Sequence, residues 1–138
     1  MTGVQTCALP IYRAYGYNKN GQVSKVQDVT GRLTNYVYDT MNRIKQVYDS
    51  GKKVADYTYY PNYMPKSVNF ANGVEVNYGY DLDKNRTQAT TISPSGKVLL
   101  EHSYGYDGNG NQLWKQEAQA KTSYTYDRVN RLAAVNSL

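Results

Sequence analysis

The 138-residue sequence has few of the residues that build most enzyme and metal sites. It contains one cysteine, Cys7, and one histidine, His102. A disulfide framework needs paired cysteines, and a thiolate metal site needs several of them. The composition therefore excludes a disulfide-stapled fold and a cysteine-based metal site, and we expect no cofactor.

Long apolar runs and clusters of like charge are also missing. Sixteen Lys and Arg residues stand against eleven Asp and Glu, a net charge of +5, and the longest basic run is Lys52-Lys53. No segment approaches the roughly 18 apolar residues of a membrane-spanning helix. These features argue against a nucleic-acid-binding face and against membrane insertion.

Aliphatic side chains are scarce, but tyrosine is abundant. The chain has thirteen Val, eight Leu, three Ile and one Phe, compared with sixteen Tyr. A tyrosine ring buries a large apolar area while its hydroxyl stays at a wet edge. We therefore expect a thin structure in which tyrosine supplies much of the apolar contact.

The first eleven residues, MTGVQTCALPI, differ in character from the rest. They lack the basic region and apolar run of a secretory signal, and they resemble the conceptual translation of a sequencing adapter. We expect residues 1–11 to be an artefactual leader without a role in the fold. Residues 12–138 are then expected to be a fragment of a longer natural chain.

A Tyr-x-Tyr pair recurs six times, and its first tyrosines are 21, 21, 21, 26 and 20 residues apart. Aspartate follows the pair in four repeats, with Asn18 and Tyr60 as departures. Fixed-period similarity of this kind indicates a tandem repeat architecture. The structural residues of the repeat are Tyr15, Tyr17, Tyr36, Tyr38, Asp39, Tyr57, Tyr59, Tyr78, Tyr80, Asp81, Tyr104, Tyr106, Asp107, Tyr124, Tyr126 and Asp127.

The residues after each pair predict a hairpin turn. An aspartate accepts hydrogen bonds from backbone N–H groups nearby, and the Gly or Asn three residues later in most repeats tolerates a positive φ. Together they suit a type I turn closed by a left-handed residue. Lys84 fits that position poorly, and the third repeat, YTYYPNYMPK (57–66), is expected to form a different turn.

Between the turns, side chains alternate as in strands. In residues 74–80, valines and tyrosines share one face, while Glu75, Asn77 and Gly79 share the other. Each repeat therefore predicts two short strands and two turns, and residues 41–50 also favour a strand. We expect an all-β antiparallel meander of ten to twelve strands that curves in one direction. An uncapped array of this kind is expected to be marginally stable and prone to associate.

The repeated motif resembles the Rhs or YD-repeat family, and the resemblance covers residues 12–138. The resemblance implies a segment of a larger β-shell, like the shells of bacterial Rhs toxins, Tc toxins and teneurins. The segments that carry it are GRLTNYVYDTMNRI (31–44), YGYDLDKNRT (78–87), YGYDGNGNQL (104–113) and YTYDRVNRL (124–132).

A shell role implies a structural, non-catalytic segment whose partners are neighbouring repeats and an encapsulated C-terminal toxin domain. It also implies a bacterial protein that is secreted or displayed at the cell surface. The alternative is a tyrosine-rich module that binds glycans, because aromatic faces stack on sugars. The Asp-x-x-Asn turns and the single tryptophan, Trp114, argue against that alternative.

Other functional interpretations have weaker support. An aspartate that recurs at the same repeat position is typical of a turn rather than of a catalytic pair. Residues 81–85 and 107–111 resemble the start of a calcium loop, but they lack its later glycine and glutamate. His102 and Ser103 point to opposite faces of a strand, so we expect a structural histidine. Packing is likewise expected for Trp114, and no catalytic, cofactor or metal residue is predicted.

Overall fold

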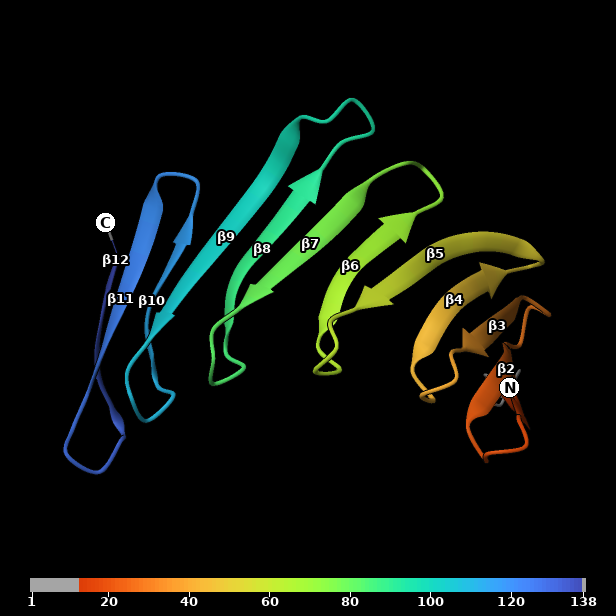
Figure 1. Cartoon of the computed structure of the whole chain (residues 1–138), viewed down its shortest axis with the longest axis horizontal. Helices are drawn as coiled ribbons and strands as arrows, with labels where there is room; N and C mark the ends of the chain where they lie inside the picture. The colour runs from red at the N-terminus through yellow and green to blue at the C-terminus, as the bar shows by residue number, and fades with distance from the viewer. Residues whose placement is uncertain (1–12, 138) are drawn as a thin grey trace, which may run out of the picture. The chain divides into compact units, whose positions relative to one another are not determined.

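The computed structural model describes residues 13–137, and every regular element within them is a β-strand (Figure 1). The predicted all-β fold is confirmed, and the twelve strands match the upper end of the expected number. No helix in the described part is long and apolar enough to cross a membrane. The expectation for residues 1–11 lies outside the described residues.

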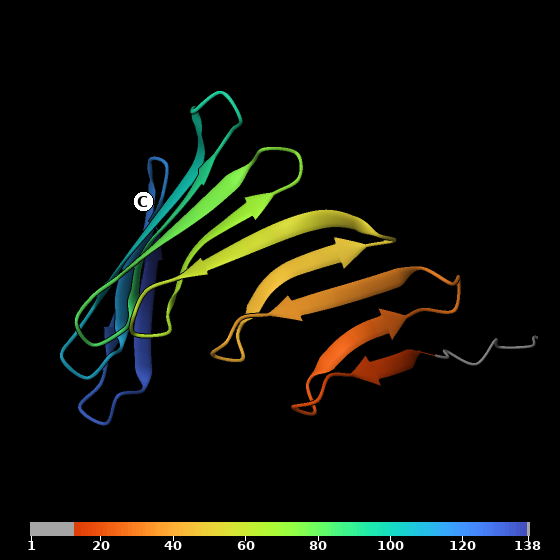
Figure 2. The same ribbon diagram turned by 45° about the vertical axis from the view of Figure 1, so that its right-hand side comes forward.

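The chain divides into two compact units, with the boundary between Val54 and Ala55. The first unit holds four strands, and each strand pairs antiparallel with the next in the chain (Figure 2). The segment 41–50, predicted as strand, supplies the fourth of them. The strands are β1 (Ala14–Tyr17), β2 (Val23–Gln27), β3 (Leu33–Tyr38) and β4 (Ile44–Asp49).

The second unit continues with the same topology. Its strands also pair antiparallel in chain order, which confirms the predicted meander. The first of its strands begins just before the boundary. The strands are β5 (Lys52–Tyr59), β6 (Pro65–Phe70), β7 (Glu75–Tyr80), β8 (Arg86–Ile92), β9 (Val98–Tyr106), β10 (Gln112–Glu117), β11 (Ala120–Tyr126) and β12 (Leu132–Ser137).

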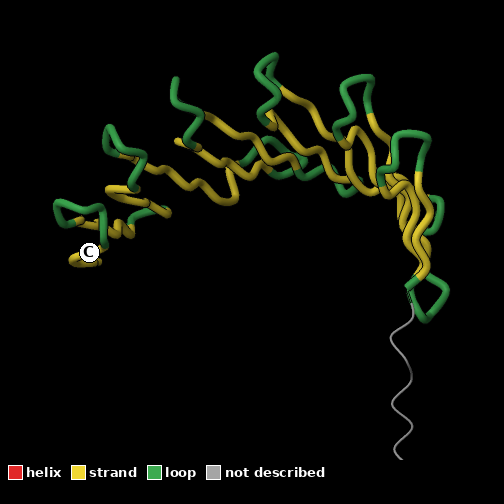
Figure 3. The backbone as a smooth tube through the Cα atoms, turned by 90° about the horizontal axis from the view of Figure 1, so that it is seen from below, coloured by secondary structure: helices red, strands yellow, loops and turns green. Residues whose placement is uncertain are grey.

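Each unit is a single layer of strands (Figure 3). Within the described residues the buried side chains are Ala55, Ser67 and Val68, with exposed fractions of 5%, 6% and 6%. Many large apolar side chains are exposed, including most of the aliphatic residues of β9 and β12. The fold is thus as thin as the shortage of aliphatic residues predicted.

A β-bulge interrupts the pairing at the second tyrosine of every repeat. In the pair β3–β4, Val37 lies opposite Gln46 but Tyr38 lies opposite Ile44, so Lys45 is an extra residue. The other five hairpins that carry a Tyr-x-Tyr pair show the same shift. A bulge bends the strand and increases its twist, and simple alternation in the sequence did not predict it.

Candidate functional site

A five-residue turn follows each Tyr-x-Tyr pair. In the second repeat the Asp39 N–H donates to the Arg43 carbonyl at 2.8 Å, and the Asn42 N–H donates to the Asp39 carbonyl at 3.1 Å. The Asp39 carboxylate accepts the N–H groups of Met41 and Arg43, each at 2.9 Å. One side chain therefore satisfies two backbone donors that the tight turn would otherwise leave to water.

The same network recurs along the chain. The side-chain oxygen of the first turn residue accepts the N–H groups of the third and fifth residues in the turns that begin at Asn18, Asp107 and Asp127. In the turn at Asp81 it accepts the N–H of the fifth residue, Asn85. Asn18 fits this position because an amide oxygen accepts hydrogen bonds as a carboxylate oxygen does.

The fifth turn residue also binds the first through its side chain. Arg43 Nε donates to Asp39 at 2.8 Å, and Asn111 Nδ2 donates to Asp107 at 2.9 Å. Backbone donation from Arg43 holds the pKa of Asp39 below its ordinary 3.8, and the Arg43 side chain adds to the effect. The Asn111 side chain is the main cause of the lowered pKa of Asp107.

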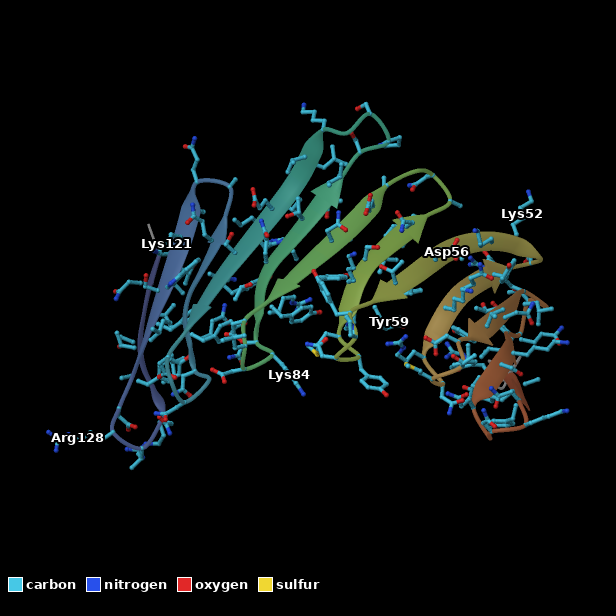
Figure 4. All side chains as sticks on the ribbon, in the orientation of Figure 1. Lys52, Asp56, Tyr59, Lys84, Lys121 and Arg128 are labelled. Carbon is cyan, nitrogen blue, oxygen red and sulfur yellow. The ribbon has the colours of Figure 1, made fainter. Side chains whose placement is uncertain are left out.

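The fourth turn residue has a left-handed backbone. The φ values are 63° and 61° at Asn42 and Asn130, and 75° and 81° at Gly21 and Gly110. Lys84, which the sequence marked as a poor fit, adopts the same conformation with φ of 68°. Its side chain extends away from the turn (Figure 4). The hydrogen bonds of the turn therefore outweigh the strain at Lys84, which asparagine or glycine would lessen.

The third repeat keeps the backbone turn, so the expectation of a different turn is wrong. The Tyr60 N–H donates to the Met64 carbonyl at 2.8 Å, and Tyr63 has φ of 71°. Tyr60 differs in its side chain, because its hydroxyl donates to the Tyr78 carbonyl at 3.0 Å. Its ring meets the Tyr80 ring edge-on, with centroids 6.2 Å apart. The Met64 N–H donates to Asn62 Oδ1 at 3.3 Å, so the turn forms without an aspartate at its first position.

The predicted tyrosine residues lie at equivalent places in the fold. Each odd-numbered strand ends at the second tyrosine of its pair. The first tyrosine lies opposite an aliphatic residue of the next strand in several repeats, as Tyr36 does with Val47 and Tyr57 with Val68. Aromatic side chains opposite β-branched ones stabilise antiparallel pairs.

The second tyrosine makes a contact that the sequence analysis did not foresee. In three repeats its hydroxyl donates a hydrogen bond to a backbone carbonyl of the preceding repeat. The acceptor is the residue that directly follows the five-residue turn of that repeat. That residue begins the neighbouring strand, so the bond ties successive repeats together. The bonds run from Tyr38 to Val23 at 2.7 Å, from Tyr106 to Arg86 at 3.0 Å and from Tyr126 to Gln112 at 2.9 Å.

The side chains of Arg86 and His102 lie beside tyrosine rings. The Arg86 guanidinium lies 5.7 Å from the Tyr78 ring centroid and 5.9 Å from that of Tyr104. His102 stacks on Tyr104 with centroids 6.3 Å apart, and its Nε2 lies 3.2 Å from Glu117 Oε2. Both side chains are engaged in packing across strands.

Trp114 packs on the opposite face, over a glycine. A Cβ on Gly105 would lie 2.1 Å from Trp114 Nε1, so the indole fills the space that glycine leaves. The Lys121 ammonium lies 4.8 Å from the indole ring. The indole is thus held between a strand and a cation, in agreement with a packing role.

The two loops that resemble calcium sites use their first aspartates within the turn. Asp81 and Asp107 accept the N–H groups of Asn85 and Asn111, which occupies oxygens that a cation would need. Across residues 13–137, no three His, Cys, Asp or Glu side chains cluster as metal ligands do. The repeated geometry orders the chain and offers no distinctive set of reactive groups.

Comparisons with known sequences point to very long proteins. No family model matches the chain. The tRNA nuclease WapA of Bacillus subtilis strain 168 is 30% identical over 100 residues, which cover 69% of this chain and 4% of that protein. The tRNA(Glu)-specific nuclease WapA of Bacillus subtilis subsp. natto matches at the same identity and with the same coverage.

Solved structures share the fold. The crystal structure of TcdB2-TccC3 matches with a TM-score of 0.79 at 20% identity, over 89% of this chain and 7% of that chain. A structure of the Photorhabdus luminescens Tc holotoxin pore matches with a TM-score of 0.78 at the same identity and coverage. The chain thus has the strand array of a short section of these toxin components. Because it spans so little of each, their activities are not transferred by the match.

Proposed function

We propose that residues 12–138 are a structural segment of an Rhs or YD-repeat shell that encloses a C-terminal toxin or effector domain. The observation that carries the proposal is the recurrence of one device, a five-residue turn plus a tyrosine hydroxyl bond to the preceding repeat. The residues of a catalytic site occur once in a chain, whereas the residues that build a repeated wall occur in every repeat. The fold shared with TccC3-containing structures supports the same role.

The segment itself is proposed to be non-catalytic. Its recurrent carboxylates bind turn N–H groups, as Asp39 and Asp127 do, and they lie in separate turns. The single histidine contacts Glu117 and a tyrosine ring, and within residues 13–137 it forms no hydrogen bond with a serine or threonine hydroxyl. The nuclease activity in the name of the WapA relatives would belong to a part of those proteins outside the matched 4%.

The partners of the segment follow from this role. They are the neighbouring repeats of the same longer chain and the enclosed domain, in a protein exported from a bacterium. Residues 1–11 are proposed to be a foreign leader. Sequencing reads that cross the boundary between Ile11 and Tyr12 within genomic DNA would overturn that part of the proposal.

Glycan binding remains the alternative, because Tyr15 and Tyr17 are 50% and 63% exposed. Three second tyrosines, however, already bond to backbone carbonyls, which favours a structural use of the pair. Retention on immobilised glycans that free sugar competes away would favour the alternative. The shell proposal expects no such retention.

The shell proposal is tested on the uninterrupted gene. The full-length protein is digested with proteinase K before and after mild denaturation. A domain downstream of the repeats should resist digestion in the native protein and become sensitive once the repeats unfold. A downstream domain that is cleaved equally fast in both states, or its absence from the gene, would contradict enclosure. Cleavage of tRNA by the 138-residue chain itself would contradict the non-catalytic assignment.

A further inference from the structure

Three Asn-Gly pairs lie in exposed turns of the described chain, Asn20-Gly21, Asn72-Gly73 and Asn109-Gly110. Each pair holds the third and fourth positions of a five-residue turn, and its glycine has a left-handed φ of 75° or 81°. Glycine has no side chain to shield its backbone nitrogen, so this nitrogen can approach the preceding asparagine side chain closely. These pairs are therefore the places where an asparagine side chain reacts most readily with its own backbone.

The turn that joins β6 to β7 differs from the other two in its side-chain bonds (Figure 1). Its backbone bonds run from the Phe70 N–H to the Val74 carbonyl at 2.8 Å and from the Gly73 N–H to the Phe70 carbonyl at 2.9 Å. Phenylalanine offers no side-chain acceptor at the first position of the turn. Asn72 Oδ1 accepts the Val74 N–H instead, at 3.1 Å. This bond folds the Asn72 side chain back toward the Gly73 peptide.

The other two asparagines bind across to a neighbouring turn. Asn20 Nδ2 donates to Asn42 Oδ1 at 2.7 Å, and Asn109 Nδ2 donates to Asn130 Oδ1 at 3.4 Å. In both turns the side chain of the first residue already accepts the N–H of the fifth, at 3.0 and 2.9 Å. The side chains of Asn20 and Asn109 are therefore drawn toward another turn and away from the glycine that follows.

We propose that Asn72 is a site of spontaneous deamidation in the folded chain. The Gly73 nitrogen bonds to the Asn72 side-chain carbon, the bond from that carbon to the amide nitrogen breaks, and ammonia leaves with the proton of the Gly73 N–H. Water then opens the resulting succinimide ring at either carbonyl, which gives aspartate or isoaspartate. The Val74 N–H already binds Asn72 Oδ1, where negative charge develops during the attack, so it stabilises the transition state.

The cost of freeing the attacking nitrogen is shared by all three pairs. The Gly73 N–H must release the Phe70 carbonyl before its nitrogen can attack, and the N–H groups of Gly21 and Gly110 make the equivalent bond at 3.0 Å. Because this cost is nearly equal, it does not favour one pair over another. The difference in rate comes from the side-chain bond of Asn72.

The two products act differently on the fold. A carboxylate oxygen of aspartate keeps the bond from the Val74 N–H, as Asp39 does with the backbone of its own turn. Isoaspartate adds one carbon to the backbone at position 72, so the spacing of the turn bonds is lost and hairpin β6–β7 is loosened. The reaction gives this hairpin a chemical lifetime, whatever a shell encloses.

Mass spectrometry of proteolytic peptides tests the proposal on the full chain. The folded chain is incubated in mildly alkaline buffer, and the loss of each asparagine is followed with time. Asn72 should react about tenfold faster than Asn20 or Asn109, the effect of one hydrogen bond to a developing charge. Equal rates at the three Asn-Gly pairs, or a lower rate at Asn72, would overturn the proposal.

Two controls separate the effect of the fold from that of local sequence. Asn62 Oδ1 accepts the Met64 N–H at 3.3 Å, but Asn62 precedes Tyr63 rather than glycine, so it should stay unmodified. In concentrated guanidinium chloride the three Asn-Gly pairs should react at similar rates, because the turn bonds are lost. If Asn72 still reacted fastest in the denatured chain, local sequence rather than the turn would be the cause, and the proposal would fail.

Phe70→Asp tests the role of the Val74 N–H. The new carboxylate at the first turn position should accept this N–H, as Asp39 accepts that of Arg43, and leave Asn72 Oδ1 without its donor. Deamidation at Asn72 should then slow about tenfold in the folded chain. Phe70→Leu, which adds no acceptor, is the matched control and should leave the rate unchanged. Equal rates in Phe70→Asp and the unmodified chain would contradict the proposed mechanism.

Discussion

The two tyrosines of a pair have different roles, although the sequence shows them as equals. Tyr36 lies opposite Val47 and stabilises the strand pair through its ring, whereas the Tyr38 hydroxyl donates to the Val23 carbonyl. The sequence predicted that both rings share one face, because that follows from alternation. It could not predict the hydroxyl bond, because its acceptor lies in the preceding repeat and carries no recognisable side chain.

Tyr38→Phe should lower the free energy of unfolding by about 1 kcal/mol, the usual net value of one hydrogen bond. The measurement is the urea midpoint of the far-UV strand signal at fixed chain concentration. Tyr36→Phe is the matched control and should change the midpoint far less, since its hydroxyl makes no hydrogen bond within the part that the structure describes. A larger loss for Tyr36→Phe would contradict the division of roles.

Lys84→Gly should stabilise the chain by about 1 kcal/mol, because glycine adopts a φ of 68° without the steric cost that other residues incur. Lys84→Ala removes the long side chain but keeps the Cβ, so it should give no comparable gain. Both variants are compared in the same urea assay. If alanine stabilised as much as glycine, the side chain rather than the backbone would be the source of strain.

At the scale of the hairpin, the sequence predicted the order of strands and turns but missed their details. The Asp-x-x-Asn pattern correctly indicated a turn closed by a left-handed residue, as at Asn42 and Asn130. The bulge at each second tyrosine was missed because pairing depends on two strands at once. The turn at Tyr60 was misjudged because its backbone bonds form without an aspartate.

The turns should lose stability in acid. The pKa values of Asp39, Asp107 and Asp127 lie below the ordinary 3.8 in the folded chain. A carboxyl group whose pKa is lower in the folded chain than in the unfolded chain stabilises the fold at any pH above its unfolded pKa. This stabilisation is lost as the pH falls through the folded pKa. The urea midpoint should therefore stay level from pH 7 to about pH 5 and fall below about pH 4.

Asp107→Asn supplies the control for this acid dependence. The amide oxygen should keep the backbone bonds, as Asn18 does in the first turn, but it does not titrate. The variant should show a smaller loss of stability between pH 5 and pH 3 than the unmodified chain. An unchanged acid loss would mean that Asp107 is not one of the titrating groups.

Gly105→Ala should destabilise the hairpin β9–β10 by about 1–3 kcal/mol, because the new Cβ would meet the Trp114 indole at 2.1 Å. Gly79→Ala is the matched control, since its Cβ would lie 3.3 Å from the nearest atom, in Gln88. Hydrogen exchange of the two hairpins locates the effect. In a Trp114→Ala background the cost of Gly105→Ala should largely vanish, and a persistent cost would exclude the clash as its cause.

At the scale of the whole molecule, the feature that matters most is that each of the two compact units is a single layer of strands. The three side chains buried within residues 13–137, those of Ala55, Ser67 and Val68, cannot supply the core of an ordinary domain. The sequence predicted this from its few aliphatic residues and its repeat. It could not predict the register between repeats, because register appears only when the strands are paired.

Sedimentation velocity of the full chain over a range of concentrations tests the central claim most directly, namely that this chain is a segment of a β-repeat wall. A wall segment built as a single layer should show mass that rises with concentration, because its strands and turns leave apolar side chains such as Leu82 and Val129 exposed. The account is contradicted by a single compact monomer whose sedimentation coefficient does not change with concentration. Such a result would identify the chain as a self-sufficient domain.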